Sequence, residues 1–403
     1  MKKILFIACG ALLAASSCTS EVNEEGFIDK ANAISFNAYP NKSRALGSDV
    51  TSDNMKGDNF GVVGYSVNNH NIYLYKQDAS VYKGVEQKWV SNGENSGTWE
   101  YADMGDLKFW PNNAMDFYAY FPFSDNVTFT QRNAPSGEGV TSTTVMTIPN
   151  VKCAHDVLFA YVGNQSKIGR VPLNFHHAFA KMKSLQIEMP ANGMLYRSGC
   201  HITVQKVEFI NTSTSGDIKV DNAGIASYTV ASPNLTLSKD LSSTLVTVDK
   251  TATLGTLIDN GTSANGYFFA TNSTTDAVNN VKGTAKTMWD GDKRNITGQD
   301  GKLSNSELVC LKLTCKVWNG ADNNKYYYVG GNDNYGEIFI PLTGSSSEPN
   351  SVTTFDAGKS YTYTIKMKDN VGFTDEGDPI LTPILFEVES VADWSDVTVT
   401  ITL

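Results

Sequence analysis

The sequence is short of the features that mark membrane-spanning and nucleic-acid-binding proteins. Its apolar stretch from Ile4 to Ala15 has twelve residues, whereas a helix needs about 20 to cross a bilayer. Charged residues make up only 18% of the 403 residues, and acidic side chains outnumber basic ones by 42 to 32. A chain with a formal net charge of −10 has no basic patch with which to displace counterions from phosphates. We therefore predict no membrane-spanning helix and no nucleic-acid partner.

Motifs that carry common enzyme chemistry are also missing. The sequence has no G-x-S-x-G elbow, no H-E-x-x-H zinc motif and no phosphate-binding loop. The adjacent His176 and His177 would point to opposite faces of a strand, so a structural role is favoured over a metal site. The segment 290–295 begins like a calcium loop, but it has Arg294 at a ligand position and Asn295 where glycine is required. We predict no catalytic residue, no metal site, no cofactor and no enzyme activity; two carboxylates meeting in space, as in glycosidases, are the enzymatic alternative.

Cysteine is too scarce to build a disulfide framework. Cys9 and Cys18 lie near the N-terminus, and the rest of the chain has four cysteines, namely Cys153, Cys200, Cys310 and Cys315. Cys310 and Cys315 are five positions apart in one predicted strand, where an odd spacing places side chains on opposite faces and argues against a bridge between them. Buried free thiols are the favoured interpretation, and two bridges are the alternative.

The N-terminus has the composition of a cleavable export signal. Lys2 and Lys3 precede the apolar stretch, and Ser16 and Ser17 stand directly before Cys18. Small residues before a cysteine resemble the bacterial lipobox, which implies that residues 1–17 are a lipoprotein signal peptide and that Cys18 is lipidated. Residues 18–33 then form a polar tether with three glutamates, similar to those of surface-directed lipoproteins of the Bacteroidales. This implies an outer-membrane lipoprotein exposed at the cell surface.

The tether leads into a segment with the pattern of a half-buried strand. Ile34, Phe36 and Ala38 alternate with polar residues up to Pro40. Arg44 follows shortly after, and it is one of only five arginines. A cut between Arg44 and Ala45 would remove the anchor and this first strand together, and it would expose a sheet edge with unpaired N–H and C=O groups.

The C-terminal segment is a candidate to fill such an edge. Strict alternation of apolar residues with threonine predicts a strand there that could be added to a neighbouring subunit. The apolar residues of this predicted donor strand are Val397, Val399, Ile401 and Leu403. The alternative is that this strand stays in its own domain.

Most of the remaining chain also reads as short strands separated by polar turns, which favours β-sandwiches. The length exceeds the usual size of one domain, and we predict two, at residues 34–172 and 173–403. Alternation is clearest at 311–317 and 361–367, and a shift in alternation between 202–204 and 207–209 predicts a β-bulge. Segment 220–295 is rich in Ser, Thr, Asn and Gly, and long surface loops are expected there.

An ordered series of short motifs resembles the fimbrillin family of the Bacteroidales, the subunits of type V pili. The resemblance implies two tandem transthyretin-like β-sandwich domains of Greek-key type and export as a lipoprotein. It also implies cleavage after the first strand by an arginine-specific protease, at Arg44–Ala45 here, and insertion of a strand from another subunit into the vacated groove. The motifs are FGVVGY at 60–65, WEY at 99–101, WP at 110–111, FYAYFP at 117–122, HHAFAKM at 176–182, FDAGKSY at 355–361 and VADW at 391–394.

Two functions from different classes follow. The first is a structural subunit, in the shaft or at the tip of a type V fimbria, that is assembled by donor-strand exchange and supports adhesion. Its partners would be other fimbrillin subunits, the outer membrane before cleavage, and a host or microbial surface glycan or protein. The second is a lipid-anchored glycan-binding protein of a nutrient-uptake system, in which the aromatic clusters at 117–121 and 326–328 would stack on sugars; tyrosine-rich strands more often simply pack.

Overall fold

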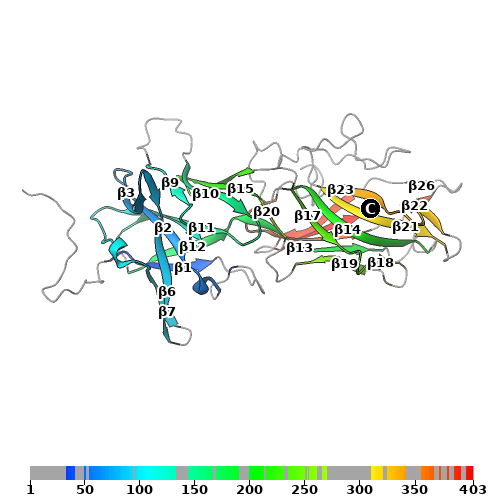
Figure 1. The fold of residues 1–403 in the computed structure, drawn as a ribbon, viewed down its shortest axis with the longest axis horizontal. Helices are drawn as coiled ribbons and strands as arrows, with labels where there is room; N and C mark the ends of the chain where they lie inside the picture. The colour runs from blue at the N-terminus through cyan, green and yellow to red at the C-terminus, as the bar shows by residue number, and fades with distance from the viewer. Residues whose placement is uncertain are drawn as a thin grey trace, which may run out of the picture.

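The protein is built almost entirely of β-strands, as the sequence predicts. A computed structural model describes residues 33–40, 50, 54–93, 96–132, 144–166, 169–189, 199–212, 215–230, 235–249, 252, 254–260, 266–269, 310–320, 325–341, 355–366, 372–373, 379–380, 385–391 and 396–402. Within these ranges the only helices are two short 3-10 turns, η2 (Asn54–Gly57) and η3 (Met104–Asp106). The strands form two sandwiches that follow one another along the long axis of the molecule (Figure 1). The all-β class is confirmed, and the transthyretin-like arrangement stays a prediction.

The first sandwich has one large sheet and one smaller sheet. The large sheet has eight strands, seven of them in the order β1 (Phe36–Pro40), β12 (Val171–His177), β11 (Leu158–Gln165), β8 (Met115–Phe121), β2 (Phe60–Ser66), β6 (Val85–Gly93) and β7 (Ser96–Tyr101), with β3 (Ile72–Leu74) paired to β2. The smaller sheet has the order β16 (Ala226–Val230), β15 (Ser215–Asp221), β10 (Thr144–Lys152), β9 (Thr128–Phe129), β5 (Val81–Lys83) and β4 (Lys76–Asp78). The β6–β7 hairpin projects from the sandwich (Figure 1).

The central strands of the large sheet, β2 and β8, are buried on both faces, which explains why they are mainly apolar. In β8, Phe117 belongs to the core on one face, whereas Tyr118 and Tyr120 belong to the core between the two sheets. Buried tyrosines need partners for their hydroxyls. Tyr118 Oη donates to the carbonyl of Asn222 at 2.9 Å, and Tyr120 Oη donates to that of Ser124 at 3.0 Å. β8 therefore contributes a phenylalanine to one core and two hydrogen-bonded tyrosines to the other.

The second sandwich also has two sheets. One has the order β19 (Leu254–Asp259), β13 (Phe179–Glu188), β24 (Ser360–Lys366), β28 (Asp396–Thr402) and β27 (Leu385–Val391), with β20 (Tyr267–Phe269) paired to β13. The other has the order β17 (Leu235–Asp240), β14 (His201–Thr212), β21 (Cys310–Asn319) and β22 (Tyr326–Val329), with β18 (Val246–Val248) on β14 and β23 (Gly336–Pro341) on β21. A separate ribbon pairs β25 (Gly372–Phe373) with β26 (Pro379–Ile380).

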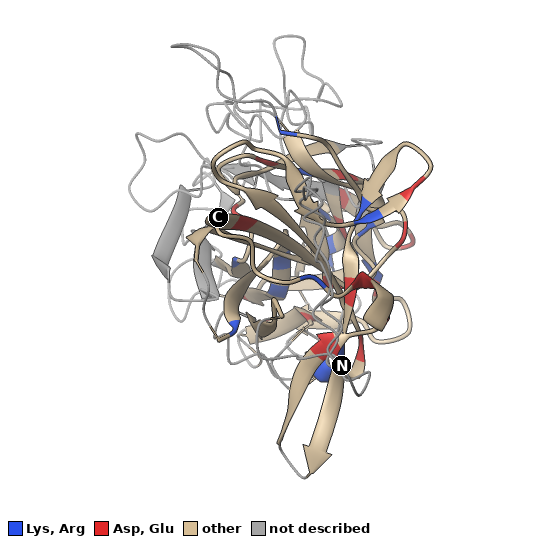
Figure 2. Cartoon of the chain, turned by 90° about the vertical axis from the view of Figure 1, so that its left-hand side faces the viewer, with Lys and Arg blue, Asp and Glu red and all other residues tan. Residues whose placement is uncertain are grey.

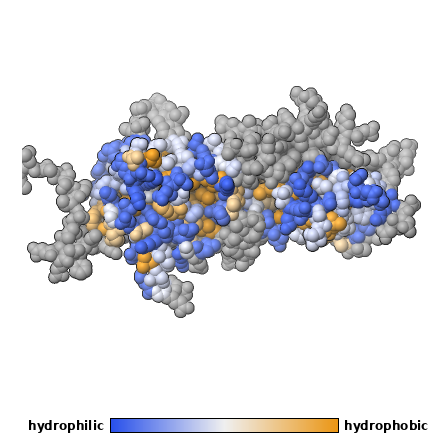
Figure 3. All heavy atoms as spheres, viewed as in Figure 1, coloured by the Kyte–Doolittle hydropathy of each residue, from blue (hydrophilic) through white to orange (hydrophobic). Residues whose placement is uncertain are grey.

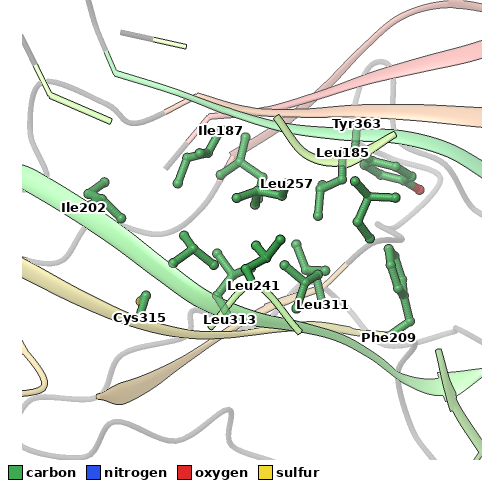
Figure 4. Packing of buried hydrophobic residues seen from close by; sticks show 14 of the residues in the cluster. Leu185, Ile187, Ile202, Phe209, Leu241, Leu257, Leu311, Leu313, Cys315 and Tyr363 are labelled. Carbon is green, nitrogen blue, oxygen red and sulfur yellow. The ribbon is translucent and has the colours of Figure 1, made fainter. Parts of the chain in front are cut away.

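The core of the second sandwich lies between these sheets. Leu185 and Ile187 from β13 face Leu311 and Leu313 from β21 (Figure 4). The strong alternation predicted at 311–317 and 361–367 is confirmed by burial of every second described residue of β21 and β24. The predicted bulge is confirmed as a register shift between Val204 and Lys206 in the pairing of β14 with β21.

Two features of the sheets were not predicted from the sequence, while residues 270–295 of the predicted loop segment lie outside the described residues and the two-domain division stays a prediction. The described part of segment 220–295 contains strands β16 to β20 rather than long loops, because threonine-rich segments fit strands that are only half buried. The sheets also cross the boundary predicted between residues 172 and 173. β12 continues past it to His177, and β15 returns from the second half to pair with β10.

Few large hydrophobic side chains are exposed among the described residues. The face drawn in Figure 3 is largely hydrophilic, with small apolar areas. Lysine and arginine are interspersed with aspartate and glutamate on the end of the first sandwich, where the β6–β7 hairpin again stands away from the body (Figure 2). Among the described residues, no helix is long and apolar enough to cross a membrane.

Candidate functional site

The first strand, β1, lies at one end of the large sheet. Its sheet neighbour is β12, to which it runs parallel, with Phe36 opposite Val171 and Ala38 opposite Leu173. Just before β1, the chain is also held on its other side, since Ala33 forms an antiparallel bridge with Phe109. The N–H of Ile34 donates to the carbonyl of Lys108 at 2.9 Å. The sequence gives no local signal for this second contact, because Lys108 lies more than seventy positions away.

The predicted apolar face of this strand points into the core that contains Phe117. Ile34 and Phe36 are fully buried, and Ala38 is half-buried against the same core. Phe36 meets the rings of Phe60 and Phe117 edge-on, with centroids 6.4 and 5.4 Å apart. Tyr39, on the other face, is 50% exposed. The strand is thus a structural part of the core although it has one sheet neighbour.

A cavity of about 140 Å³ lies where the chain enters β1. It is bordered by the start of the first strand, the end of β7 and the turn that follows β7. The polar residues Ser35, Glu100 and Arg170 contribute to its rim. Its apolar lining consists of Ala33, Ile34, Trp99, Tyr101, Met104 and Leu107.

The predicted cleavage position lies between β1 and the next anchored point of the chain. Arg44 and Ala45 are outside the described residues, as is the predicted lipidation residue Cys18. The chain is described again at Val50, whose N–H donates to Asp156 Oδ2 at 3.1 Å. The same oxygen is 2.7 Å from His177 Nδ1, and both side chains are buried. Sequence reasoning did not find this arrangement, because its members are far apart in the chain.

Two other arginines are described, and both sit in structured surroundings. Arg132 is 2.5 Å from Asp116, and the side chains of this pair are only 11% and 9% exposed. Its guanidinium also lies over the rings of Tyr65 and Tyr118, at 5.6 and 5.9 Å from their centroids. Arg170 is half-buried at the rim of the cavity. Arg132 is therefore poorly accessible to a protease in the folded chain.

The predicted donor strand corresponds to β28. In this structure it lies inside its sheet, parallel to β24 on one side and antiparallel to β27 on the other. Val397, Val399 and Ile401 pair through their backbones with Tyr361, Tyr363 and Ile365 in the same order. Leu403 is outside the described residues.

The cysteines and histidines have the structural roles favoured by the sequence. Cys153, Cys200 and Cys315 are buried free thiols, and the side chain of Cys310 is outside the described part. Burial raises the pKa of Cys200 and of Cys315 to about 12. His177 is buried and His176 exposed, as opposite faces require. Among the described residues, no group of three or more His, Cys, Asp or Glu could hold a metal ion; segment 290–295 lies outside them.

The two aromatic clusters differ in exposure. Residues 117–121 are all buried, so this cluster packs, as the sequence favoured, and the alternative of sugar stacking does not apply to it; both faces of its strand are used by the cores. At the second cluster, Tyr327 is half-buried in a cross-strand row with Trp318 and His201. The Trp318 ring stacks on that of His201 at 5.0 Å and lies 6.3 Å from that of Tyr327.

These features define an all-β protein with two sandwiches. Its edge strand β1, which precedes Arg44 in the sequence, contributes buried side chains to the core that contains Phe117. The profile of the fimbrillin-like family matches residues 43–297, which is more than half of the sequence, and the chain belongs to this family. Family membership places it among the fimbrillin-like proteins. No curated protein sequence matches the chain.

Among solved structures, the chain matches several bacterial proteins at low sequence identity. A protein described as a cell adhesion protein from Parabacteroides distasonis is 8% identical, with coverage of 92% of this chain and 96% of the other and a TM-score of 0.40. A protein with the same description from Bacteroides ovatus is 13% identical, with coverage of 87% and 94% and a TM-score of 0.32. The fimbrial anchor protein Mfa2 from Porphyromonas gingivalis is 10% identical, with coverage of 55% and 79% and a TM-score of 0.21.

Proposed function

We propose that this protein is a structural subunit, in the shaft or at the tip of a type V fimbria, assembled by proteolysis and strand exchange. The observation that carries the proposal is the position of β1. It is an edge strand of the large sheet, and its buried side chains are nevertheless part of the core that contains Phe117. Arg44 follows the end of this strand by four residues. A cut after Arg44 leaves β1 held only by non-covalent contacts.

Export and anchoring are the earlier steps of the proposal. They rest on the sequence alone, with residues 1–17 as signal peptide and lipid attached to Cys18. The anchor would hold the uncut chain at the outer membrane, with the tether 18–33 ahead of β1. Cleavage would release the subunit from this anchor and prepare its groove in a single step, which couples assembly to arrival at the cell surface.

The energetics favour exchange after the cut and stability before it. Loss of β1 would leave the edge of β12 unpaired, and each main-chain hydrogen bond that is restored contributes about 0.5–1.5 kcal/mol net. An apolar side chain that becomes fully buried contributes about 1.5–3 kcal/mol, and Ile34 and Phe36 both meet that condition. An incoming strand that reproduces these contacts would form a long-lived join, whereas the uncut chain already satisfies them internally.

The source of the incoming strand is the second part of the proposal. Donation of β28 requires this strand to leave both β24 and β27, so it costs the hydrogen bonds of two ladders. A strand contributed by a sibling subunit from a segment outside any sheet avoids this cost. The partners proposed are therefore other fimbrillin subunits, of this or a sibling kind, with adhesion to a host or microbial surface as the purpose of the assembly.

An arginine-specific protease tests the proposal directly. Purified chain is treated with the protease, the new N-terminus is sequenced, and particle size is followed by light scattering. We expect a new terminus at Ala45 and growth of oligomers, and the Arg44→Gln variant should show neither. Arg294→Gln, which removes another arginine of the sequence, is the matched control and should be cut after Arg44 and assemble like the parent chain. Chain cut at Arg44 that remains monomeric, alone and with sibling subunits, contradicts strand exchange.

A second candidate function is glycan binding beside a nutrient-uptake system. It is favoured by the row of His201, Trp318 and Tyr327, because partly exposed aromatic rings flanked by polar groups suit sugar recognition. Lys325 lies over the Trp318 ring at 5.2 Å, and Asp249 lies 3.2 Å from His201. A glycan array decides between the two functions. Binding that is lost in Trp318→Ala but kept in Tyr39→Ala favours this candidate, and absence of any binding contradicts it.

A further inference from the structure

The cavity borders the place that the start of the first strand occupies. Ala33 and Ile34 line it from the first strand, and Arg170 lines it from the residue that directly precedes β12. The Ala33–Phe109 bridge and the β1–β12 pairing run along the same stretch of chain. Any strand that takes the place of β1 therefore passes this cavity, and its residue at the Ala33 position lies at the cavity wall.

The native strand fills this end of its groove incompletely. Ala33 presents only a methyl group, although it is 8% exposed and thus well inside the protein. A cavity of about 140 Å³ is close to the roughly 150 Å³ that accommodates a benzene ring in a protein core. By contrast, Ile34 and Phe36, one and three positions further along, have large side chains that are fully buried. Of the three strand residues that line the cavity, Ala33 has the smallest side chain.

The lining indicates what kind of side chain the cavity accepts. Trp99, Tyr101 and Leu107 provide apolar surface, and Trp99 and Tyr101 are 5% and 6% exposed. Glu100 and Arg170 carry opposite charges at the rim, so the cavity has no net charge to attract an ion. An aromatic or branched aliphatic side chain thus gains contacts here that alanine does not make, because apolar burial is favourable in proportion to area.

We propose that this cavity is a specificity pocket for the incoming strand of another subunit. It receives one large apolar side chain, at the position that Ala33 occupies in the uncut chain. This inference rests on the proposed strand exchange and explains why the exchange favours the incoming strand over the native one. The native strand is a sufficient but imperfect occupant, and a donor with a larger residue at this position outcompetes it once the covalent link has been cut.

Synthetic peptides test the pocket on the cut protein. Chain cut at Arg44 and freed of its N-terminal fragment is titrated with a peptide of residues 31–40, in its native form and with Ala33→Leu or Ala33→Phe, by fluorescence anisotropy. We expect the larger side chains to bind about tenfold more tightly, which corresponds to about 1.4 kcal/mol. A peptide with Asn37→Leu is the control, because it places a leucine at a strand position that does not line the cavity.

A variant of the pocket itself completes the test. Met104 lines the cavity and is 38% exposed, so Met104→Trp should obstruct the pocket without disturbing the core. In that variant the native and Ala33→Leu peptides should bind equally. Equal affinity of the two peptides for the unaltered cut protein overturns the pocket but leaves strand exchange standing.

The uncut chain provides a measurement that does not depend on exchange. If no peptide binds to correctly folded cut protein, strand exchange itself is contradicted, and the melting temperature of uncut Ala33→Leu then decides the pocket. A rise of about 2–4 °C shows that the cavity accepts the larger side chain. An unchanged or lower melting temperature shows that it does not, and overturns the inference.

Discussion

Phe36 of the first strand meets Phe117 of the central strand β8 edge-on, with ring centroids 5.4 Å apart and an interplanar angle of 81°. Aromatic pairs in this geometry add about 0.5–1.5 kcal/mol to the gain from burial. We therefore expect Phe36→Ala to lower the free energy of unfolding of the uncut chain by about 3–5 kcal/mol, the usual cost of removing a buried phenylalanine. Urea unfolding followed by tryptophan fluorescence measures this change.

The matched control for Phe36 is its neighbour on the opposite face. Tyr39 belongs to the same strand but is 50% exposed, so Tyr39→Ala should leave the unfolding midpoint nearly unchanged. Similar losses in Phe36→Ala and Tyr39→Ala would mean that β1 does not contribute its inward face to the core. In that case a cut at Arg44 would open no apolar groove.

The pair formed by Arg132 and Asp116 is a second structural element of the first sandwich. Asp116 Oδ1 also accepts a hydrogen bond from the N–H of Asn164 at 2.7 Å, so its carboxylate connects three segments. Removing one partner of a buried pair leaves a charge without compensation, which costs about 3–5 kcal/mol. We expect this loss for Asp116→Ala in urea unfolding. The double variant Arg132→Met with Asp116→Leu should recover much of it, and no recovery would show that the hydrogen bonds, rather than the unpaired charge, dominate.

The close approach of Tyr120 to two glycines gives a prediction about packing. A Cβ at Gly61 would fall within the Tyr120 ring, and one at Gly84 would lie 2.7 Å from it. Gly61→Ala should therefore destabilise the protein by about 1–3 kcal/mol, as overpacking usually does. Gly57→Ala is the control, since nothing lies within 4 Å of its added carbon. Thermal melts of the two variants compare them, and equal melting temperatures would contradict the packing of Tyr120 on β2.

The buried tyrosines predict a loss of stability at high pH. Desolvation raises the pKa of Tyr65, Tyr118 and Tyr120 well above the ordinary value of 10.0. Above about pH 10 the unfolded chain releases these protons while the folded chain keeps them, so the unfolded state is favoured increasingly. Below that pH the stabilisation is fully present. Each group should cost up to about 1.4 kcal/mol per pH unit in this range.

Tyrosine absorbance near 295 nm measures this transition. We expect the buried tyrosines to ionise together with the loss of β-sheet circular dichroism, in one cooperative step. Urea unfolding at pH 8, 10 and 11 should give steadily lower midpoints only above pH 10. Reversible ionisation of all 18 tyrosines near pH 10 without unfolding would contradict the burial described above.

The sequence predicts local structure here better than it predicts pairing. Alternation identified β21 and β24 because each buries one face. It did not reveal that β1 pairs parallel to β12, or that β15 returns to β10. Such contacts join residues more than sixty positions apart, and nothing in a strand's own pattern names its neighbour. The strand of Ile34, Phe36 and Ala38 could be predicted from alternation, whereas the cavity beside Ala33 could not, since it depends on where β7 ends.

Asp156 gives the last prediction, because it fixes the chain just after the proposed cut. Its Oδ2 accepts the N–H of Val50 at 3.1 Å and lies 2.7 Å from His177 Nδ1. Asp156→Ala removes both contacts inside the protein, and each buried polar group that loses its partner costs about 1–3 kcal/mol. We expect a lower unfolding midpoint and loss of hydrogen-exchange protection at the Val50 amide. Asp125→Ala, at an exposed position, should change neither quantity.

The same substitution separates anchoring of the new N-terminus from release of the first strand. In chain cut at Arg44, aminopeptidase should stop before Val50 in the parent protein but proceed further in Asp156→Ala, because the backbone there is no longer held. Release of β1 should be equally fast in both, since the contacts of the Asp156 carboxylate described here are with Val50 and His177, outside that strand. If trimming stops at the same residue in both proteins, Val50 is held by other contacts, and Asp156 serves only the stability of the first sandwich.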